Sequence, residues 1–243
     1  MRYFVTALQF LTRIHLFKES EWSAKRFGRS VVFFPLVGMV IGIILLMINH
    51  FVGSYLSAHL TAILLVITSF IVTGALHCDG LMDTADGLLS GRSRERMLEI
   101  MKDSRVGSAG VTTFVLLVAV KWALLEDISA NLLPLALVVA PVLARLVMVM
   151  AITLFPYARP EGIGKLFAQY TGRRDFVYAS CLTAFLLFPL AFYSSRVFVS
   201  LFSGLLFGSL FCRYTVTKLG GLTGDVYGAA TELTEIVALM AFL

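Results

Sequence analysis

Long apolar runs alternate with short polar segments along most of this chain. A membrane-spanning helix uses about 20 residues, and seven runs approach that length: 31–52, 56–76, 111–125, 132–154, 176–193, 197–212 and 226–243. Several runs are short, so we expect tilt or local thinning of the bilayer. The pattern predicts an all-α, polytopic membrane bundle of about seven transmembrane helices. Six or eight remain open if one short run is assigned differently.

The first thirty residues follow a different pattern. Apolar positions recur on one helical stripe, with basic residues around it; the stripe consists of Phe4, Leu8, Leu11 and His15. A helix with a basic polar face is typical of a segment that lies in the membrane interface. We therefore expect an interfacial segment at 1–30 and a transmembrane bundle at 31–243, together forming one membrane-embedded domain over residues 1–243.

Composition agrees with a lipid environment. The chain is 58% hydrophobic and 14% charged, with a mean hydropathy of +0.88, whereas soluble domains carry roughly 25% charged residues. The net charge of +5 does not indicate a nucleic-acid partner, because the basic residues lie in short loops between apolar runs. The lipid bilayer is the expected partner.

The basic residues also predict an orientation. Seventeen of the twenty Lys and Arg residues fall before the first span or within 77–110, 156–175 and 213–225, whereas the loops near 53–57 and 126–131 have none. Cytoplasmic loops carry the excess of basic residues. We therefore expect a multi-pass protein of the inner (plasma) membrane, with its N-terminus and active site on the cytoplasmic side.

The strongest chemical signal is the segment HCDGLMDTADG at 77–87. Its acids, Asp79, Asp83 and Asp86, are spaced i, i+4 and i+7, which places them on one face of a helix. Like charges on one face repel, so a compensating cation is expected. Mg²⁺ prefers oxygen ligands and completes its shell with water and substrate phosphates. A solvated acidic helix end is the alternative interpretation.

A second cluster, MKDSRVGSAG at 101–110, closes the same polar segment. Lys102 and Arg105 supply charge for phosphate, and small residues before a helix let backbone approach an anion. Asp103 adds a further acid. An ordinary linker has a similar composition, so this cluster alone does not decide the matter.

A third cluster, GGLTGDVYGAATELTE at 220–235, leads into the last run. Carboxylates at or inside a membrane boundary are functional candidates, and Asp225, Glu232 and Glu235 fall at helical spacing. An internal ion pair between Glu235 and Arg145 is the structural alternative. Arg159, in the loop 155–164, and Arg13 are further candidates for phosphate contact, although Arg13 also fits the positive-inside bias.

Taken together, HCDGLMDTADG, MKDSRVGSAG and GGLTGDVYGA closely resemble the adenosylcobinamide-GDP ribazoletransferase (cobalamin synthase) family, and the likeness covers nearly the whole chain. The resemblance implies a membrane enzyme of late cobalamin assembly that requires Mg²⁺. Such an enzyme joins α-ribazole, or its 5′-phosphate, to adenosylcobinamide-GDP and releases GMP. It also implies a metal and phosphate site at Asp79, Asp83, Asp86 and Asp103, with Asp225 as a further acid. Glu232 departs from the amide expected in the final motif.

The residues and this chemistry agree. Attack of a ribazole 5′-hydroxyl on the β-phosphorus of the pyrophosphate requires neutralisation of charge on the transferred phosphoryl group. We expect Asp79 and Asp83 to hold Mg²⁺ and Asp86 to contribute to the same metal site. Asp86 or Asp103 is expected to accept the hydroxyl proton. The expected substrate- and phosphate-binding residues are Lys102, Arg105, Arg13, Arg159 and Asp225.

Other functions are also compatible with these sequence patterns. A CDP-alcohol-type membrane phosphotransferase or a prenyltransferase would use related metal–pyrophosphate chemistry. An ion-coupled transporter would also place charged groups within spans, but its site is expected near the bilayer midplane, often between repeated halves. Here the acids lie at loop–helix junctions on one side, and the sequence has no convincing internal repeat. A homo-oligomer is compatible with the sequence.

Overall fold

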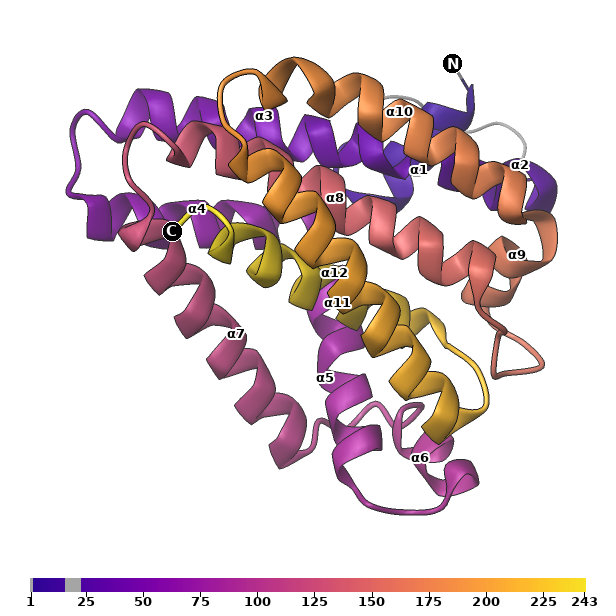
Figure 1. Ribbon diagram of the computed structural model, residues 1–243. Coiled ribbons are helices and arrows are strands. Elements are labelled where there is room, and N and C mark those ends of the chain that lie inside the picture. Colours follow the sequence, from indigo (N-terminus) through magenta and orange to yellow (C-terminus); the bar gives the residue numbers. More distant parts are fainter. Residues whose placement is uncertain (1, 16–22) are drawn as a thin grey trace.

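The structure, a computed structural model, describes residues 2–15 and 23–243. Within that part, helices are joined by short loops (Figure 1), and β-type pairing is confined to an isolated bridge between Tyr157 and Leu222. The predicted all-α class is confirmed. The elements are α1 (Arg2–Leu11), α2 (Ala24–Arg29), a 3-10 turn η1 (Ser30–Phe33), α3 (Phe34–Val52), α4 (Ala58–Thr73), α5 (Leu76–Leu89), α6 (Arg94–Ile100), α7 (Ser108–Asp127), α8 (Leu133–Leu154), α9 (Ile163–Tyr170), α10 (Arg173–Ala191), α11 (Arg196–Leu219) and α12 (Gly224–Met240).

Each of the seven predicted apolar runs forms a helix. Among the described residues, five helical stretches are long and apolar enough to cross a membrane, and a sixth is obtained if the bent pair α4 and α5 is counted as one span. The prediction of a polytopic helical membrane bundle is confirmed. The seventh run forms α12, which has only 17 residues and carries three acids. We take α3, α4, α7, α8, α10 and α11 as the membrane-spanning helices.

Helix α8 is the centre of the bundle. Its most apolar stretch is 94% buried, and α3, α10, α11 and α12 pack against it. Two pairs of glycines spaced by four residues make this packing close. A Cβ at Gly38 or Gly42 of α3 would meet the α8 backbone within 3 Å, and one at Gly204 or Gly208 of α11 would meet α8 side chains. Small residues at this spacing are a common way for membrane helices to approach one another.

A sharp break separates α4 from α5. Gly74 and Ala75 both have positive φ, at 63° and 55°, a conformation that ends an α-helix and is unfavourable for a residue with a Cβ. The two helices consequently differ in direction by 92°. The backbone N–H of Arg13 donates to the carbonyl of Val72 next to the break, at 2.8 Å. Helix α5 therefore leaves the span and runs against α7 and α12 (Figure 1).

The N-terminal segment packs on the bundle. Leu8 and Leu11 of the predicted stripe are buried, Phe4 is partly buried, and His15 is exposed. Helix α1 contacts α2, η1 and α3, so its apolar face is covered by protein. The interfacial placement of residues 1–30 stays a prediction, and residues 16–22 of that segment lie outside the described residues.

Candidate active site

The first two sequence motifs meet at Asp86. Its carboxylate accepts hydrogen bonds from the backbone N–H of Gly107 at 2.7 Å and of Gly110 at 2.8 Å. Gly107 is the residue before α7, so Asp86 satisfies two N–H groups at the start of that helix. Asp86 thereby fixes the end of the 101–110 segment on α5. This contact gives Asp86 a structural partner that the sequence did not predict.

The third motif packs against the first. A Cβ at Gly80 of α5 would lie 2.6 Å from the carbonyl oxygen of Asp225, and one at Gly228 of α12 would lie 3.0 Å from that of His77. The glycines thus let the two backbones come close. As a result, Asp225 at the start of α12 faces the acidic side of α5.

A loop brings Arg159 to the same place. The backbones of Ala158 and Leu222 are joined by a hydrogen bond of 2.8 Å, which helps to dock the loop after α8 onto the loop before α12. Arg159 Nη1 then lies 2.9 Å from Asp225 Oδ2, and the hydroxyl of Thr223 donates to the same oxygen at 3.1 Å. Both contacts use one oxygen of Asp225.

We call Asp79, Asp83 and Asp225 the acid cluster. The negative charge of this cluster exceeds the positive charge that the described residues place beside it. Burial, together with the nearby charges of Asp225 and Asp79, raises the pKa of the half-buried Asp83 to about 7. Burial likewise raises the pKa of Asp225, against the opposing effect of Arg159. Arg159 pairs with Asp225, whereas Asp79 and Asp83 have no ion pair or hydrogen-bond partner among the described side chains.

The remaining predicted site residues lie apart from this cluster. Asp103 is exposed and forms a two-pronged ion pair with Arg105, at 3.0 and 2.6 Å; hydrogen bonds from Arg105 lower the pKa of Asp103 to about 2. Lys102 is also exposed. The side chain of Arg13 is exposed and lies against Gly74 at the break between α4 and α5. Of the four predicted phosphate-binding cations, the structure brings only Arg159 into contact with an acid of the cluster.

The acid cluster suits a hard cation that also binds phosphate. Among the described residues, no group of three or more His, Cys, Asp or Glu side chains is preassembled around a metal position. Mg²⁺ does not require one, because it is commonly held by one or two carboxylates together with water and substrate phosphates. The unpaired carboxylates of Asp79 and Asp83 provide such a donor set. Asp86, whose two oxygens already accept backbone N–H groups, is the least available of the three predicted ligands.

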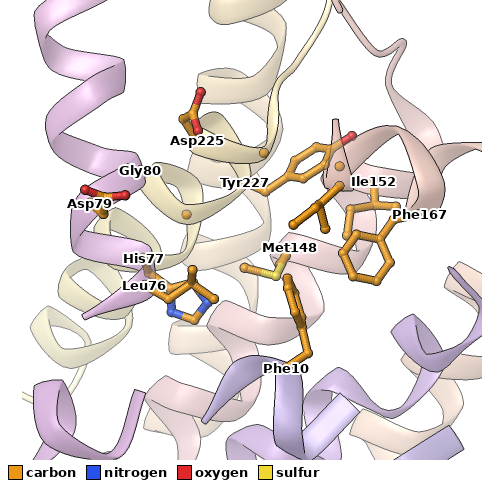
Figure 2. A pocket seen from close by; sticks show the side chains of 14 residues that line it. Phe10, Leu76, His77, Asp79, Gly80, Met148, Ile152, Phe167, Asp225 and Tyr227 are labelled. Carbon is orange, nitrogen blue, oxygen red and sulfur yellow. The ribbon is translucent and has the colours of Figure 1, made fainter. Parts of the chain in front are cut away.

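A cavity of about 170 Å³ adjoins the cluster (Figure 2). Asp79 and Asp225 line it together with apolar and aromatic side chains from α1, α8, α9 and α12. The full lining is Phe10, Leu76, His77, Asp79, Gly80, Met148, Ile152, Ile163, Gly164, Phe167, Gly224, Asp225, Tyr227 and Gly228. The arrangement therefore joins a polar, metal-compatible edge to an apolar chamber.

Comparison with known proteins gives a consistent result. The family described as cobalamin-5-phosphate synthase matches residues 3–243. Proteins named adenosylcobinamide-GDP ribazoletransferase are similar over nearly the whole chain. They include those of Thermoanaerobacter pseudethanolicus (36% identity, covering 98% of this chain and 96% of the relative), Desulfitobacterium hafniense (37%, 99% and 96%) and Fusobacterium nucleatum (35%, 100% and 97%). The chain belongs to the cobalamin-5-phosphate synthase family. It is therefore a membrane-helical transferase of cobalamin biosynthesis. No solved structure matches it.

The protein also contains a buried ion network, which we define as Lys121, Arg145, Glu232 and Glu235. Lys121 Nζ lies 2.5 Å from Glu232 and 2.6 Å from Glu235. Arg145 pairs with Glu235, so the predicted structural alternative for these two residues is confirmed. Glu232, which replaces the expected amide, pairs with a lysine that the sequence reasoning missed. The available signal was a cation inside the apolar run of α7.

Proposed function

We propose that the chain catalyses the Mg²⁺-dependent transfer of α-ribazole, or its 5′-phosphate, onto adenosylcobinamide-GDP. The products are adenosylcobalamin, or its 5′-phosphate, and GMP. The names of the relatives supply the substrates. The observation that carries the metal dependence is the pair of unpaired carboxylates, Asp79 and Asp83, on the helix that borders the cavity.

Asp79 and Asp83 are the residues that would hold Mg²⁺, an ion that binds few carboxylates and also takes water and phosphate oxygens as ligands. When bound, Mg²⁺ neutralises charge on the pyrophosphate and on the departing GMP. Arg159, held near the cluster by Asp225, adds a guanidinium for phosphate oxygens. Lys102 and Arg105 remain proposed phosphate ligands, and Arg105 would have to exchange its pairing with Asp103 for a substrate oxygen.

The bonds that change can be written completely. A ribose hydroxyl oxygen bonds to the β-phosphorus, the bond between that phosphorus and the bridging oxygen of GMP breaks, and the hydroxyl proton goes to a base. A substrate that keeps a 5′-phosphate in the product cannot attack through its 5′-oxygen. We therefore revise the 5′-hydroxyl expected from sequence to a secondary ribose hydroxyl.

Asp225 is our proposed proton acceptor. It lines the cavity, and burial raises its pKa, which makes its carboxylate a stronger base. Its ion pair and side-chain hydrogen bond use Oδ2, which leaves Oδ1 for the substrate. Asp86 and Asp103 were the earlier candidates. Asp86 is occupied by two backbone N–H groups, and the lowered pKa of Asp103 makes it a weak base.

We further propose that the acid cluster faces the cytoplasm from the inner membrane, because the basic loops gather at this end of the bundle. Ser93 and Ser129 are exposed in the segments that precede and follow α7. Single cysteines at these positions, in a chain without its native cysteines, should react with a membrane-impermeant thiol reagent from opposite sides. Labelling of both from the outside would reject this orientation.

The reaction is tested with purified protein, labelled adenosylcobinamide-GDP, and either α-ribazole or α-ribazole 5′-phosphate. We expect GMP and one cobalamin product in equal amounts, with Mg²⁺ and not with excess chelator. Replacement of ribazole by a lipid alcohol separates this function from a lipid-directed phosphotransferase. GMP release with the lipid alcohol alone, or equal turnover without divalent metal, would contradict the proposal.

A further inference from the structure

The cavity beside the acid cluster has a preformed aromatic wall. Phe10 and Phe167 lie with ring centroids 5.1 Å apart, and Phe27 stacks on Phe167 at 4.5 Å. Phe34 supports the same ring edge-on at 5.6 Å. Such contacts hold the rings in place before a ligand arrives. Met148 and Ile152 of α8 complete the apolar surface (Figure 2).

Two polar groups in this lining have no partner. Nε2 of His77 and the hydroxyl of Tyr227 make no hydrogen bond with any described residue, although the side chains are only 2% and 3% exposed. Buried polar groups are normally paired. Arg145 Nη2 lies 3.3 Å from His77 Nδ1, and a guanidinium can only donate, so Nδ1 accepts and the neutral ring carries its proton on Nε2. His77, which lines the cavity, therefore carries one N–H donor that no described residue accepts.

We propose that this cavity receives the aromatic base of the ribazole substrate, an inference that rests on the proposed function. A benzimidazole base is flat and largely apolar, and it has one ring nitrogen free to accept a hydrogen bond from His77 Nε2. A dry cavity of about 150 Å³ takes up a benzene-sized ring, so a cavity of 170 Å³ that opens to solvent suits a slightly larger ring. The attached ribose would then lie at the rim, where Asp79 and Asp225 can accept from its hydroxyls.

Guanine, the other aromatic base in the reaction, fits this chamber poorly. It carries several polar groups around its edge, each of which loses water on entry and needs a partner. The lining offers His77 and Tyr227 in the interior, while its other interior side chains are apolar. The corrinoid is far too large. The chemistry of the wall thus selects the base with a single acceptor.

Gly224 provides a test variant. It lines the cavity, and a Cβ built there would meet nothing within 4 Å, so Gly224→Leu places a side chain in the mouth without an initial clash. Gly172, before α10, is equally unobstructed and does not line the cavity. Gly172→Leu is therefore the matched control.

Radiolabelled benzimidazole is the binding probe, measured by equilibrium dialysis against purified full-length protein and against detergent micelles alone. We expect Gly224→Leu to weaken binding by roughly tenfold or more and Gly172→Leu to leave it unchanged. Indole, which lacks the acceptor nitrogen, should bind the parent about three- to tenfold more weakly than benzimidazole. In turnover, Gly224→Leu should raise KM for ribazole far more than KM for adenosylcobinamide-GDP.

Three results would overturn the assignment. The first two are no benzimidazole binding by the parent and equal benzimidazole binding by the parent and Gly224→Leu. The third is displacement of benzimidazole by GMP, together with a loss of GMP affinity in Gly224→Leu that equals its loss of benzimidazole affinity. The binding measurement needs no turnover. If the parent binds benzimidazole, Gly224→Leu does not, and no GMP is released from adenosylcobinamide-GDP, the proposed reaction is contradicted. The cavity then remains a site for an aromatic heterocycle.

Discussion

The acid cluster and the buried ion network share one helix, α12, yet they treat charge in opposite ways. Asp225 lies at the N-terminal end of α12, and Glu232 and Glu235 follow two to three turns later. In the buried network two cations face two carboxylates, and all four side chains are enclosed. In the acid cluster three carboxylates face one cation that the described residues supply. The first group is complete without a ligand, whereas the second is left with negative charge.

This difference separates structural from functional charge within one membrane protein. An ion pair inside a membrane bundle persists when its charges are matched, since removal of one partner leaves a buried charge uncompensated. Excess charge of one sign at a cavity is unfavourable in the empty protein and becomes favourable when a counter-ion binds. The two groups should consequently respond differently to substitution, metal and pH.

The largest expected effect is on the buried network. Lys121→Met leaves Glu232 without its cation and should cost about 3–5 kcal/mol of stability, which lowers the melting temperature by roughly 10 °C. The double variant Lys121→Met, Glu232→Gln restores the balance through Arg145 and Glu235 and should recover most of that loss. Melting curves of purified protein measure both. Equal melting of parent and single variant would show that the network contributes no stability.

The next effect is on turnover. Asp83→Asn removes one charge from the acid cluster and should lower the rate of ribazole transfer by about 10²–10³, without lowering the melting temperature of the metal-free protein. Asp127→Asn, an exposed acid at the far end of α7, is the control and should retain the parental rate. Near-parental turnover by Asp83→Asn at saturating Mg²⁺ would remove Asp83 from the site.

A smaller effect is expected at Asp86. Asp86→Ala leaves two N–H groups at the start of α7 without their acceptor and should cost roughly 0.5–2 kcal/mol, as loss of a helix cap does. Hydrogen exchange of the segment around Gly107 and Gly110 should accelerate. Asp86→Asn keeps one acceptor oxygen and should fall between. Unchanged exchange in Asp86→Ala would mean that this carboxylate does not hold the loop.

The smallest effect is the pH dependence of the empty protein. The pKa of Asp83 is raised to about 7 in the folded protein, so its stabilising contribution is complete below its unfolded pKa near 4 and is lost as pH rises through 7. In chelator, the melting temperature of the parent should therefore fall by a few degrees between pH 5 and pH 8. Asp83→Asn should flatten this slope. The same slope in both proteins would assign it to other groups.

Local sequence patterns predicted much of this molecule. Apolar runs are set by about 20 consecutive residues, so the seven helices could be located, and the spacing of Asp79, Asp83 and Asp86 correctly placed them on one helix. Glu235 and Arg145 were paired correctly because few charges lie within apolar runs. Resemblance added the family, which periodicity alone does not specify.

What sequence could not supply depends on contacts between distant segments. Because of the 92° bend at Gly74 and Ala75, α5 is a separate helix and does not continue the second predicted span. The backbone N–H groups that engage Asp86 lie more than twenty residues away, and the cation that reaches Asp225 comes from a loop docked by backbone hydrogen bonds. Composition does not show which carboxylate already has hydrogen-bond partners and which one is unpaired.

The most direct test of the central claim is whether Mg²⁺ binds where negative charge is left over. Thermal stability should be measured against Mg²⁺ concentration, with inorganic pyrophosphate present, for the parent, Asp83→Asn, and the charge-balanced variant Lys121→Met, Glu232→Gln. We predict that Mg²⁺ stabilises the parent and the charge-balanced variant and stabilises Asp83→Asn little or not at all. Equal stabilisation of all three proteins would contradict it.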